Sequence, residues 1–365
     1  MSDVFLFGTL QDRALRALVF GSTAKPVKLE PTVLVGYKAV ETDDFGGASL
    51  VPDVDGSVAG IVASGLSGDA VDRIRYYTQA TGLDETNVKI GDATALAFTA
   101  LNPADTMWSL DKWRAAHSQV AMRVAGDIMA FADRFSPTEM AQRLIPIRMR
   151  AEAWVTAQNQ PARGEFETER DVIVHGHTRA YMNFFAVDEM DLQFRRFDGS
   201  FSEKVNRGAL VMGDAVIVLP YDPVADTVLL IEQFRAPLFL GGSRNPWLFE
   251  PVAGLIDPGE TPEQSAMREA REEAGISLTQ LVPVGNAHSS SGSLSDNLKL
   301  FIGLADLSDV SGGGGLATEG EDIRSHVIQL DALMDGIDNQ QFPHLPLQFL
   351  GLWLARHRER IRAMA

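Results

Sequence analysis

The chain has 365 residues, of which 45% are hydrophobic and 22% are charged, a composition typical of a globular protein with room for two domains. Its formal net charge of -17 excludes a protein that is basic throughout, as nucleic-acid binding favours, and the lack of cysteine excludes disulfides and thiolate metal ligands. No apolar run reaches the length of a bilayer and no signal peptide opens the chain, so we expect a cytoplasmic protein without nucleic-acid or membrane partners.

Residues 1–157 are expected to form a first domain of short strands followed by helices. An apolar strand in VFLFGTL stops at Gly8, and further strands are expected in TVLVGYKAV and SVAGIVASGL, before a helix in AVDRIRYYTQ. A long helix is predicted from about Leu110 to Phe135. The next helix begins at Ser136-Pro137-Thr138-Glu139, a capping box with proline at the first helical position, and is interrupted at Pro146.

The polar stretch AQNQPARGE (157–165) predicts a linker, and residues 163–365 predict the second domain. DAVIVLPYDPVADTVLLIEQFR has two apolar runs around a Pro/Asp turn, which indicates a β-hairpin. The helix 261–275 has a capping box at its start and a glycine at its end. A strand in NLKLFIGLAD, a glycine-rich segment and an amphipathic helix, LQFLGLWLARHRERIRA, follow.

The helix 261–275 carries three acidic residues on one face. Glu269 and Glu273 are four residues apart and Glu272 adjoins them, so the like charges repel one another unless something positive lies between them. Carboxylate oxygens of this kind suit Mg²⁺, which protein sites often share with substrate phosphates. Arg268 could pair with Glu260 across the preceding loop. An ordinary solvated acidic face, balanced by arginines, is the alternative.

The spacing in GLIDPGETPEQSAMREAREEAGI resembles the Nudix box, Gly-x5-Glu-x7-Arg-Glu-U-x-Glu-Glu-x-Gly-U, in which U is apolar. All nine fixed positions are filled, which makes the resemblance specific. They are Gly254, Glu260, Arg268, Glu269, Ala270, Glu272, Glu273, Gly275 and Ile276.

Residues 165–360 are similar to the ADP-ribose pyrophosphatase branch of the Nudix hydrolases, through the hairpin, PWLFEPVAGLID, SSSGSLSDNLKLFIG and GLATEGEDIRSHVIQLDAL. The resemblance implies an α/β/α sandwich and a homodimer whose subunits share substrate contacts. It also implies hydrolysis of ADP-ribose to AMP and ribose 5-phosphate with Mg²⁺, or with Mn²⁺ in its place. The alternatives are hydrolysis of GDP-mannose or another nucleotide sugar, and a non-catalytic module that binds a nucleotide or a carboxylate.

The resemblance also implies roles for single residues. Glu319 in TEGEDI matches the general base that activates water, and Glu272 is the other candidate for a catalytic carboxylate. The glycine run 312–315 would let the segment that bears the base close over substrate. The matched metal ligands are Ala253, through its backbone carbonyl, Glu269, Glu273 and Glu321.

The predicted substrate contacts depart from the branch in three places. Ser290-Ser291-Gly292 replaces Ser-Pro-Gly, Asp296 replaces a glutamate, and Arg207-Gly208 replaces an Arg-Glu pair. Arg235 is expected to contact a phosphate or the terminal ribose, because a guanidinium fork suits such oxygens; a surface salt bridge is the alternative. The full predicted set is Arg207, Arg235, Leu255, Ser290, Ser291, Gly292 and Asp296.

The first domain resembles the gamma-glutamylcyclotransferase-like fold, a small β-barrel with helices, through FLFGTL and the strands that follow it. The whole chain then has an α+β fold class with two domains, and fusions of this kind resemble bacterial proteins associated with tellurite resistance. Phe7-Gly8-Thr9-Leu10 supplies a loop whose backbone N–H groups bind a carboxylate in that fold. Thr78 occupies the position of the catalytic glutamate, and threonine cannot carry out the proton transfers of an acid, so we predict no cyclotransferase activity.

Several aromatic and histidine side chains are left without a catalytic role. His288 is expected to be a hydrogen-bonded structural residue, and His175 and His177 are expected on a strand without a third metal ligand. Trp247 and Phe249 alternate like core residues. The pair Phe184–Phe185 fits either a dimer interface or the core.

Overall fold

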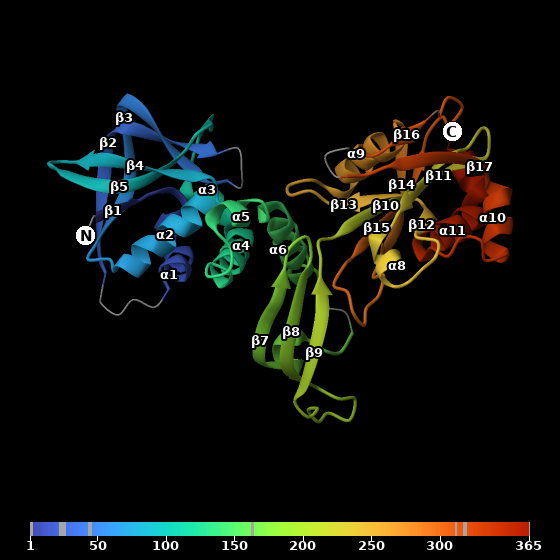
Figure 1. Ribbon diagram of the computed structural model, residues 1–365, viewed down its shortest axis with the longest axis horizontal. Helices are drawn as coiled ribbons and strands as arrows, with labels where there is room; N and C mark the ends of the chain where they lie inside the picture. The colour runs from blue at the N-terminus through green and yellow to red at the C-terminus, as the bar shows by residue number, and fades with distance from the viewer. Residues whose placement is uncertain are drawn as a thin grey trace. The chain divides into compact units, whose positions relative to one another are not determined.

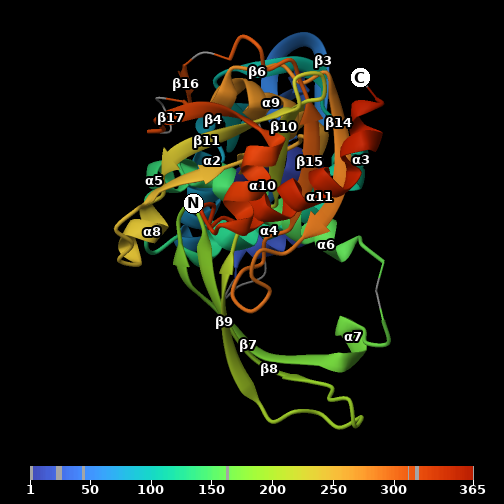
Figure 2. The same cartoon turned by 90° about the vertical axis from the view of Figure 1, so that its right-hand side faces the viewer.

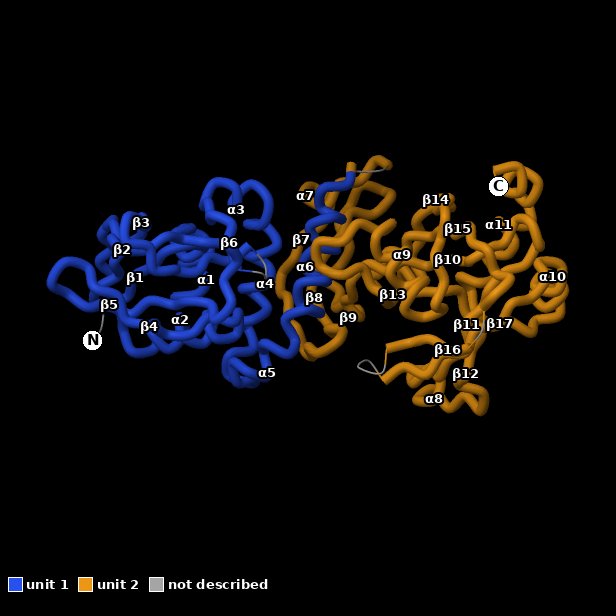
Figure 3. The backbone as a smooth tube through the Cα atoms, turned by 90° about the horizontal axis from the view of Figure 1, so that it is seen from above, with its two compact units in different colours: residues 1–160 blue, residues 161–365 orange. Residues whose placement is uncertain are grey.

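A computed structural model of the chain describes residues 3–21, 27–42, 46–161, 164–310, 312–316 and 320–364. It contains two compact units, residues 1–160 and 161–365, which are coloured separately in Figure 3. The boundary falls inside the segment 157–165 that the sequence predicts as a linker. Within the described residues, no helix is both long and apolar enough to cross a bilayer.

Unit 1 is built on a six-stranded sheet with the order β4-β5-β1-β3-β2-β6. The hydrogen-bonded ladder is an open series with β4 and β6 at its ends, where the sequence predicts a barrel. Two of the expected short strands are long arms of one hairpin, with an irregularity in register at Gly36. The strands are β1 (Asp3–Leu6), β2 (Lys28–Thr42), β3 (Ala48–Ser64), β4 (Leu83–Ile90), β5 (Ala93–Ala100) and β6 (Pro103–Met107).

The helices of unit 1 differ from the sequence prediction in two places. The long helix predicted from Leu110 to Phe135 is two helices that meet at His117, and the next breaks before Pro146, which lies in a first turn and needs no N–H partner there. The capping box at Ser136 is confirmed. The helices are the 3₁₀ turn η1 (Gly8–Gln11), α1 (Arg13–Phe20), α2 (Gly68–Ala80), α3 (Leu110–Ala116), α4 (Ser118–Ala130), α5 (Pro137–Ala141) and α6 (Leu144–Gln158).

Unit 2 contains an eight-stranded sheet with the order β14-β15-β10-β11-β17-β16, to which β12 and β13 add by pairing with β11 and β10. The predicted hairpin is confirmed as β10 and β11, which pair Tyr221 with Val228 around the turn. The strands are β10 (Ala215–Asp222), β11 (Thr227–Phe234), β12 (Trp247–Glu250), β13 (Val252–Leu255), β14 (Gln280–Ala287), β15 (Leu298–Leu304), β16 (Gly313–Gly314) and β17 (Ile323–Gln329).

Helices cover both faces of this sheet. Alternate residues of β10 point to opposite sides: Val216 and Val218 pack with α9 (Pro262–Ala274), whereas Ile217 and Leu219 pack with α10 (Leu330–Asp338) and α11 (Leu345–Arg362). Figure 1 shows α9 on one side of the sheet and α10 and α11 on the other, and in Figure 2 the latter pair lies in front of the sheet. This layered arrangement matches the α/β/α sandwich expected for the second domain, and the predicted C-terminal helix is confirmed as α11.

A separate three-stranded antiparallel sheet opens unit 2, after the one-turn helix α7 (Thr168–Asp171). It consists of β7 (Val172–Met182), β8 (Ala186–Phe194) and β9 (Val205–Val211). His175 and His177 lie on β7, as predicted, and bond to side chains on β8. Backbone hydrogen bonds of Leu210 with Ser293 and Ser295 join β9 to the segment before β15.

Candidate active site

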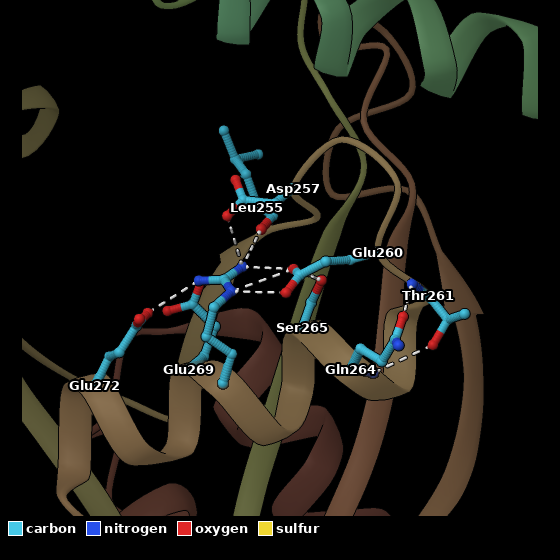
Figure 4. A network of polar contacts seen from close by, with 9 residues as sticks. Leu255, Asp257, Glu260, Thr261, Gln264, Ser265, Glu269 and Glu272 are labelled. Carbon is cyan, nitrogen blue, oxygen red and sulfur yellow. Dashed lines mark hydrogen bonds and ion pairs between the residues drawn. The ribbon is translucent and has the colours of Figure 1, made fainter. Parts of the chain in front are cut away.

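Helix α9 begins and ends at the signals predicted from the sequence. Thr261 accepts a hydrogen bond from the backbone N–H of Gln264, whose side chain in turn accepts one from the backbone N–H of Thr261 (Figure 4). Pro262 is the first helical residue, and Gly275 ends the helix in the left-handed conformation. These local signals fix the start of the helix, and therefore which residues face the sheet.

Arg268 holds the acidic face of α9 together. Its guanidinium contacts Glu260, at 3.0 Å, and donates to Glu269 at 2.7 Å and to Glu272 at 3.0 Å. It also donates to the backbone carbonyl of Leu255. Figure 4 shows these groups converging from the loop and the helix. The predicted pairing of Arg268 with Glu260 is confirmed, and the arginine offsets part of the repulsion between the glutamates.

Glu269 and Glu273 are buried between α9 and β13, 9% and 2% exposed. Glu273 accepts a hydrogen bond from the backbone N–H of Ala253 at 2.9 Å. Position 254 leaves no room for a side chain, because a Cβ there would lie 1.9 Å from Glu269 Oε1. Burial raises the pKa of Glu269 to about 7, against the opposing charge of Arg268, and raises the pKa of Glu273 to about 8. The fold thus holds two neighbouring carboxylates in positions where the ionised form is unfavourable, because burial removes its hydration.

This donor set fits a hard divalent cation, because it offers carboxylate oxygens in a buried position where a positive charge would relieve their desolvation. Glu321 acts on both carboxylates electrostatically, and one of its oxygens accepts from the backbone N–H of Leu316. Glu319 lies outside the described residues. Among those that are described, no three acidic or histidine side chains form a closed metal cluster.

The glycine run 312–315 is packed against α9. Gly313 and Gly314 form β16, which pairs with β17, and the backbone N–H of Gly315 donates to the carbonyl of Glu272 at 2.8 Å. A Cβ at Gly314 would lie 1.9 Å from the carbonyl oxygen of Glu273. The sequence predicts that glycines make this run flexible enough to close over substrate. The contacts show a different role for Gly314 and Gly315, which is to let the backbone approach α9 closely.

Arg235, a predicted substrate contact, follows β11 and precedes the short helix α8 (Ala236–Leu240). Its guanidinium makes a two-pronged contact with Glu250 at the end of β12: Nε lies 2.8 Å from Oε1, and Nη2 lies 2.5 Å from Oε2. Sequence reasoning missed Glu250. Its position at the end of a short strand gives no signal on its own, and the pairing of β11 with β12 is what brings it to Arg235.

The predicted substrate contacts after α9 lie in one turn. Ser290 bonds to Ser293 through side chain and backbone, with Ser291 and Gly292 between them. Asp296 is buried and accepts a hydrogen bond from the hydroxyl of Ser289 at 2.5 Å. His288 Nδ1 lies 2.6 Å from the carbonyl oxygen of Asp296, so the structural interpretation of this histidine is confirmed.

The remaining predicted contacts are spread over other elements. Leu255 presents its backbone to Arg268, next to the acidic cluster. Arg207 lies on β9, and it bonds to the neighbouring carbonyl of Asn206. The structure thus brings Glu269, Glu273 and the backbone of Ala253 together and leaves the predicted substrate contacts on four separate segments.

One aromatic prediction is wrong, and for one aromatic pair the structure removes an alternative that the sequence left open. Trp247 is 60% exposed and stacks edge-on with Phe234, so it is not a core residue, whereas Phe249 packs against the core as expected. The strand alternates as predicted, but only one of its faces is covered. Phe184 and Phe185 are 57% and 37% exposed, which excludes the core alternative for this pair.

Unit 1 contains a cavity of about 80 Å³. Thr78 is in its wall, 1% exposed, and its hydroxyl donates within 2.8 Å of the carbonyl of Ile74 and 3.0 Å of that of Arg75. Thr9, from the predicted carboxylate-binding loop, and Arg148 also line the cavity. The lining residues that are described include no carboxylate.

Comparison with known proteins shows which family unit 2 resembles. The family description "NUDIX domain" matches residues 212–333. The chain is 35% identical over 194 residues to an ADP-ribose pyrophosphatase of Escherichia coli (strain K12), which covers 53% of this chain and 92% of that protein. It is 37% identical over 164 residues to an ADP-ribose pyrophosphatase of Haemophilus influenzae, 44% of this chain and 76% of that one.

A GDP-mannose pyrophosphatase of Pectobacterium atrosepticum is 32% identical over 143 residues, 39% of this chain and 72% of that protein. A solved structure described as an ADP compounds hydrolase aligns with 52% of this chain and 96% of its own, at 21% identity and a TM-score of 0.40. The filled box, the buried carboxylates and the 92% coverage of a relative at 35% identity agree. The chain belongs to the Nudix family, among relatives that are named as pyrophosphatases.

Proposed function

We propose that this Nudix pyrophosphatase hydrolyses the pyrophosphate bond of ADP-ribose with Mg²⁺ and releases AMP and ribose 5-phosphate. The observation that carries the proposal is the buried pair Glu269 and Glu273, held by Arg268 and the backbone of β13. Two carboxylates in this setting are costly without a cation. The names of the relatives support the substrate.

The residues divide into three tasks under this proposal. Glu269, Glu273, Glu321 and the carbonyl of Ala253 would hold the cation, which neutralises the charge of the pyrophosphate when bound. Glu319 or Glu272 accepts the proton of the attacking water. The substrate is oriented by Arg235 and by the predicted contacts of the post-helix turn and β9, namely Arg207, Leu255, Ser290, Ser291, Gly292 and Asp296.

GDP-mannose is the second candidate substrate. It is supported by the relative that is named for it and by the altered turn at Ser290-Ser291-Gly292, where the ADP-ribose branch has a proline. Hydrogen bonds between Ser290 and Ser293 hold the turn, so its conformation does not depend on a proline. Another nucleotide sugar, or binding without turnover, would follow if neither compound is cleaved.

A product analysis tests the proposal. Purified protein comprising residues 1–365 is incubated with Mg²⁺ and ADP-ribose, with GDP-mannose in parallel, and the products are separated by ion-exchange chromatography. We expect AMP and ribose 5-phosphate, and loss of both with Glu273→Gln. The matched control is Glu263→Gln, the same change at an exposed position of the same helix, which should keep full activity. Preferential cleavage of GDP-mannose would make GDP-mannose, and not ADP-ribose, the proposed substrate. No turnover of either compound would contradict the proposal.

We also propose that the protein acts as a homodimer. The exposed aromatic residues of unit 2, Phe184 and Trp247 among them, offer apolar surface that a second copy could cover. Sedimentation velocity on the full chain should give twice the monomer mass. A monomer at micromolar concentration would contradict this part.

For unit 1 we propose a binding or structural role without cyclotransferase activity. The hydroxyl of Thr78 cannot act as a general acid or base near neutral pH, and it already donates to its own helix. A 5-oxoproline release assay with gamma-glutamyl dipeptides should show no product above the buffer blank. Clear release would contradict the proposal, because another acid would then have to serve.

A further inference from the structure

The ion pair between Arg235 and Glu250 forms at the end of β12, immediately before the strand β13 that carries Ala253 and Gly254. Glu250 is 3% exposed, so its charge is nearly cut off from water, and Arg235 occupies both of its oxygens. A buried ion pair stabilises a fold little more than apolar residues of the same size would. The stability of the fold is therefore a weak explanation for a buried ion pair at this position.

The contact geometry leaves part of the guanidinium available. Glu250 takes the Nε and Nη2 side of Arg235, and the described part of the chain offers no partner to Nη1. Arg235 remains partly open, with 37% of its side chain exposed. A guanidinium fixed along one edge can present its other edge to a phosphate oxygen without losing its orientation.

Arg235 is tied to the same stretch of chain as the candidate metal site, because its partner Glu250 lies three residues before Ala253, whose backbone N–H donates to Glu273. Burial lowers its pKa, but Glu250 outweighs this effect, and the charges of Glu273 and Glu321 add to the increase. An arginine that is free to turn toward Glu273 and Glu321 would neutralise the same carboxylates that a cation needs. Glu250 supplies the competing anchor that holds it back.

We infer that Glu250 is a positioning residue with two effects: it keeps Arg235 from occupying the carboxylates of the metal site, and it orients the free edge of Arg235 toward the substrate phosphates. This inference rests on the proposed function for the phosphate contact. Its first effect concerns metal binding alone and can be measured without any nucleotide.

The test compares single and double variants by isothermal titration of Mn²⁺ or Mg²⁺ into metal-free protein that comprises both units, without substrate. Glu250→Gln keeps the shape of the side chain and removes its charge, so Arg235 is released. We expect metal affinity to fall by about tenfold, the size seen when a residue behind a metal ligand is lost. Removing the competitor as well, in Arg235→Gln/Glu250→Gln, should restore affinity to within about twofold of wild type.

The kinetic readout should separate the two effects. With saturating metal, Glu250→Gln should raise KM for ADP-ribose more than it lowers kcat, and the double variant should not recover KM, because the phosphate contact is gone. Glu232→Gln is the matched control: Glu232 lies on the paired strand and contacts His326 and Arg324 instead, so both affinity and KM should stay at wild-type values.

Two outcomes overturn the inference: unchanged metal affinity in Glu250→Gln, or a loss that persists in the double variant, since the latter would make Glu250 a purely structural residue. If Glu250→Gln does not fold by circular dichroism, Glu250→Asp takes its place. Its shorter carboxylate cannot span both nitrogens, and it should weaken metal binding in the same direction by a smaller factor. A wild-type protein that binds metal but cleaves no ADP-ribose would contradict the proposed function and leave the metal-binding arm standing.

Discussion

Helices α2 and α9 each have 13 residues and each bury a polar side chain near the C-terminal end, yet the two side chains are held in different ways. The hydroxyl of Thr78 donates to carbonyls of its own helix. The carboxylate of Glu273 accepts a hydrogen bond from Ala253 on a neighbouring strand. The only side-chain donor of Thr78 is thus used within its own helix, whereas Glu273 bonds to Ala253 through one oxygen and can offer the other to a cation.

The largest effect should come from filling the space that Glu269 uses. In Gly254→Ala the new methyl group would fall 1.9 Å from Glu269 Oε1, so the carboxylate must move. We expect kcat/KM for ADP-ribose to fall by about 100-fold, because displacement of metal-site groups costs at least as much as loss of a supporting partner. The control is Gly176→Ala on β7, where a Cβ meets its nearest atom at 3.9 Å. Wild-type activity in Gly254→Ala would mean that the position of the Glu269 carboxylate does not matter for turnover, and it would remove the contrast between α9 and α2.

Removal of the arginine that supports α9 should have the next largest effect. Arg268→Ala leaves Glu260, Glu269 and Glu272 without their shared partner, and we expect the free energy of unfolding without metal to drop by about 2 kcal/mol. Urea denaturation followed by circular dichroism measures the change. Arg271→Ala, an exposed position on the same helix, should stay within about 0.5 kcal/mol.

The pH dependence of the metal-free protein should sharpen the contrast further. Folding raises the pKa of Glu269 to about 7 and that of Glu273 to about 8, from an ordinary 4.5. Both groups are neutral in either state at low pH. Between pH 5 and 8 the unfolded chain releases its protons first, so stability falls as the pH rises, by about 1 kcal/mol or more.

Denaturation midpoints at pH 5, 6, 7 and 8 in the presence of a chelator measure this slope. Glu269→Gln/Glu273→Gln removes both titrating groups and should flatten it. A metal-free wild type whose stability rises with pH across the same range would contradict the assignment of these two groups as buried carboxylates with raised pKa values.

The smallest effect is expected at Thr78. Thr78→Val removes a buried hydroxyl whose partners are carbonyls already bonded within the helix, so the free energy of unfolding should change by less than about 1 kcal/mol. Thermal unfolding of the full chain measures it, and ADP-ribose turnover by unit 2 should be unaffected. A large loss of stability would mean that the hydroxyl supports more than its own helix.

The elements that sequence predicted well are those whose signals are local. The ends of α9, the hairpin β10–β11 and the pairing of Arg268 with Glu260 all depend on residues a few positions apart. Predictions failed where the outcome depended on tertiary packing. The break at His117 carries no proline or glycine, and the exposure of Trp247 reflects which side of β12 is covered.

The candidate site shows the same division. The spacing of the box is enough to select Glu269 and Glu273, since a helix places positions four apart on one face. It could not reveal that Glu250 holds Arg235, because that contact spans 15 residues and depends on two strands pairing. The use of Gly314 for close approach to α9 was likewise hidden, since glycine reads as flexibility unless its neighbours are known.

The turn at Ser290 and the pair Arg235–Glu250 have different consequences for how such a protein can change over generations. The turn closes on its own serines, so single replacements there alter its surface without leaving a charge stranded in the interior. A replacement of Glu250 or Arg235 alone strands the other, so those two positions are expected to be inherited together. Under the proposed function, substrate preference can then change one residue at a time in the turn, while Arg235 and Glu250 are expected to be conserved as a pair.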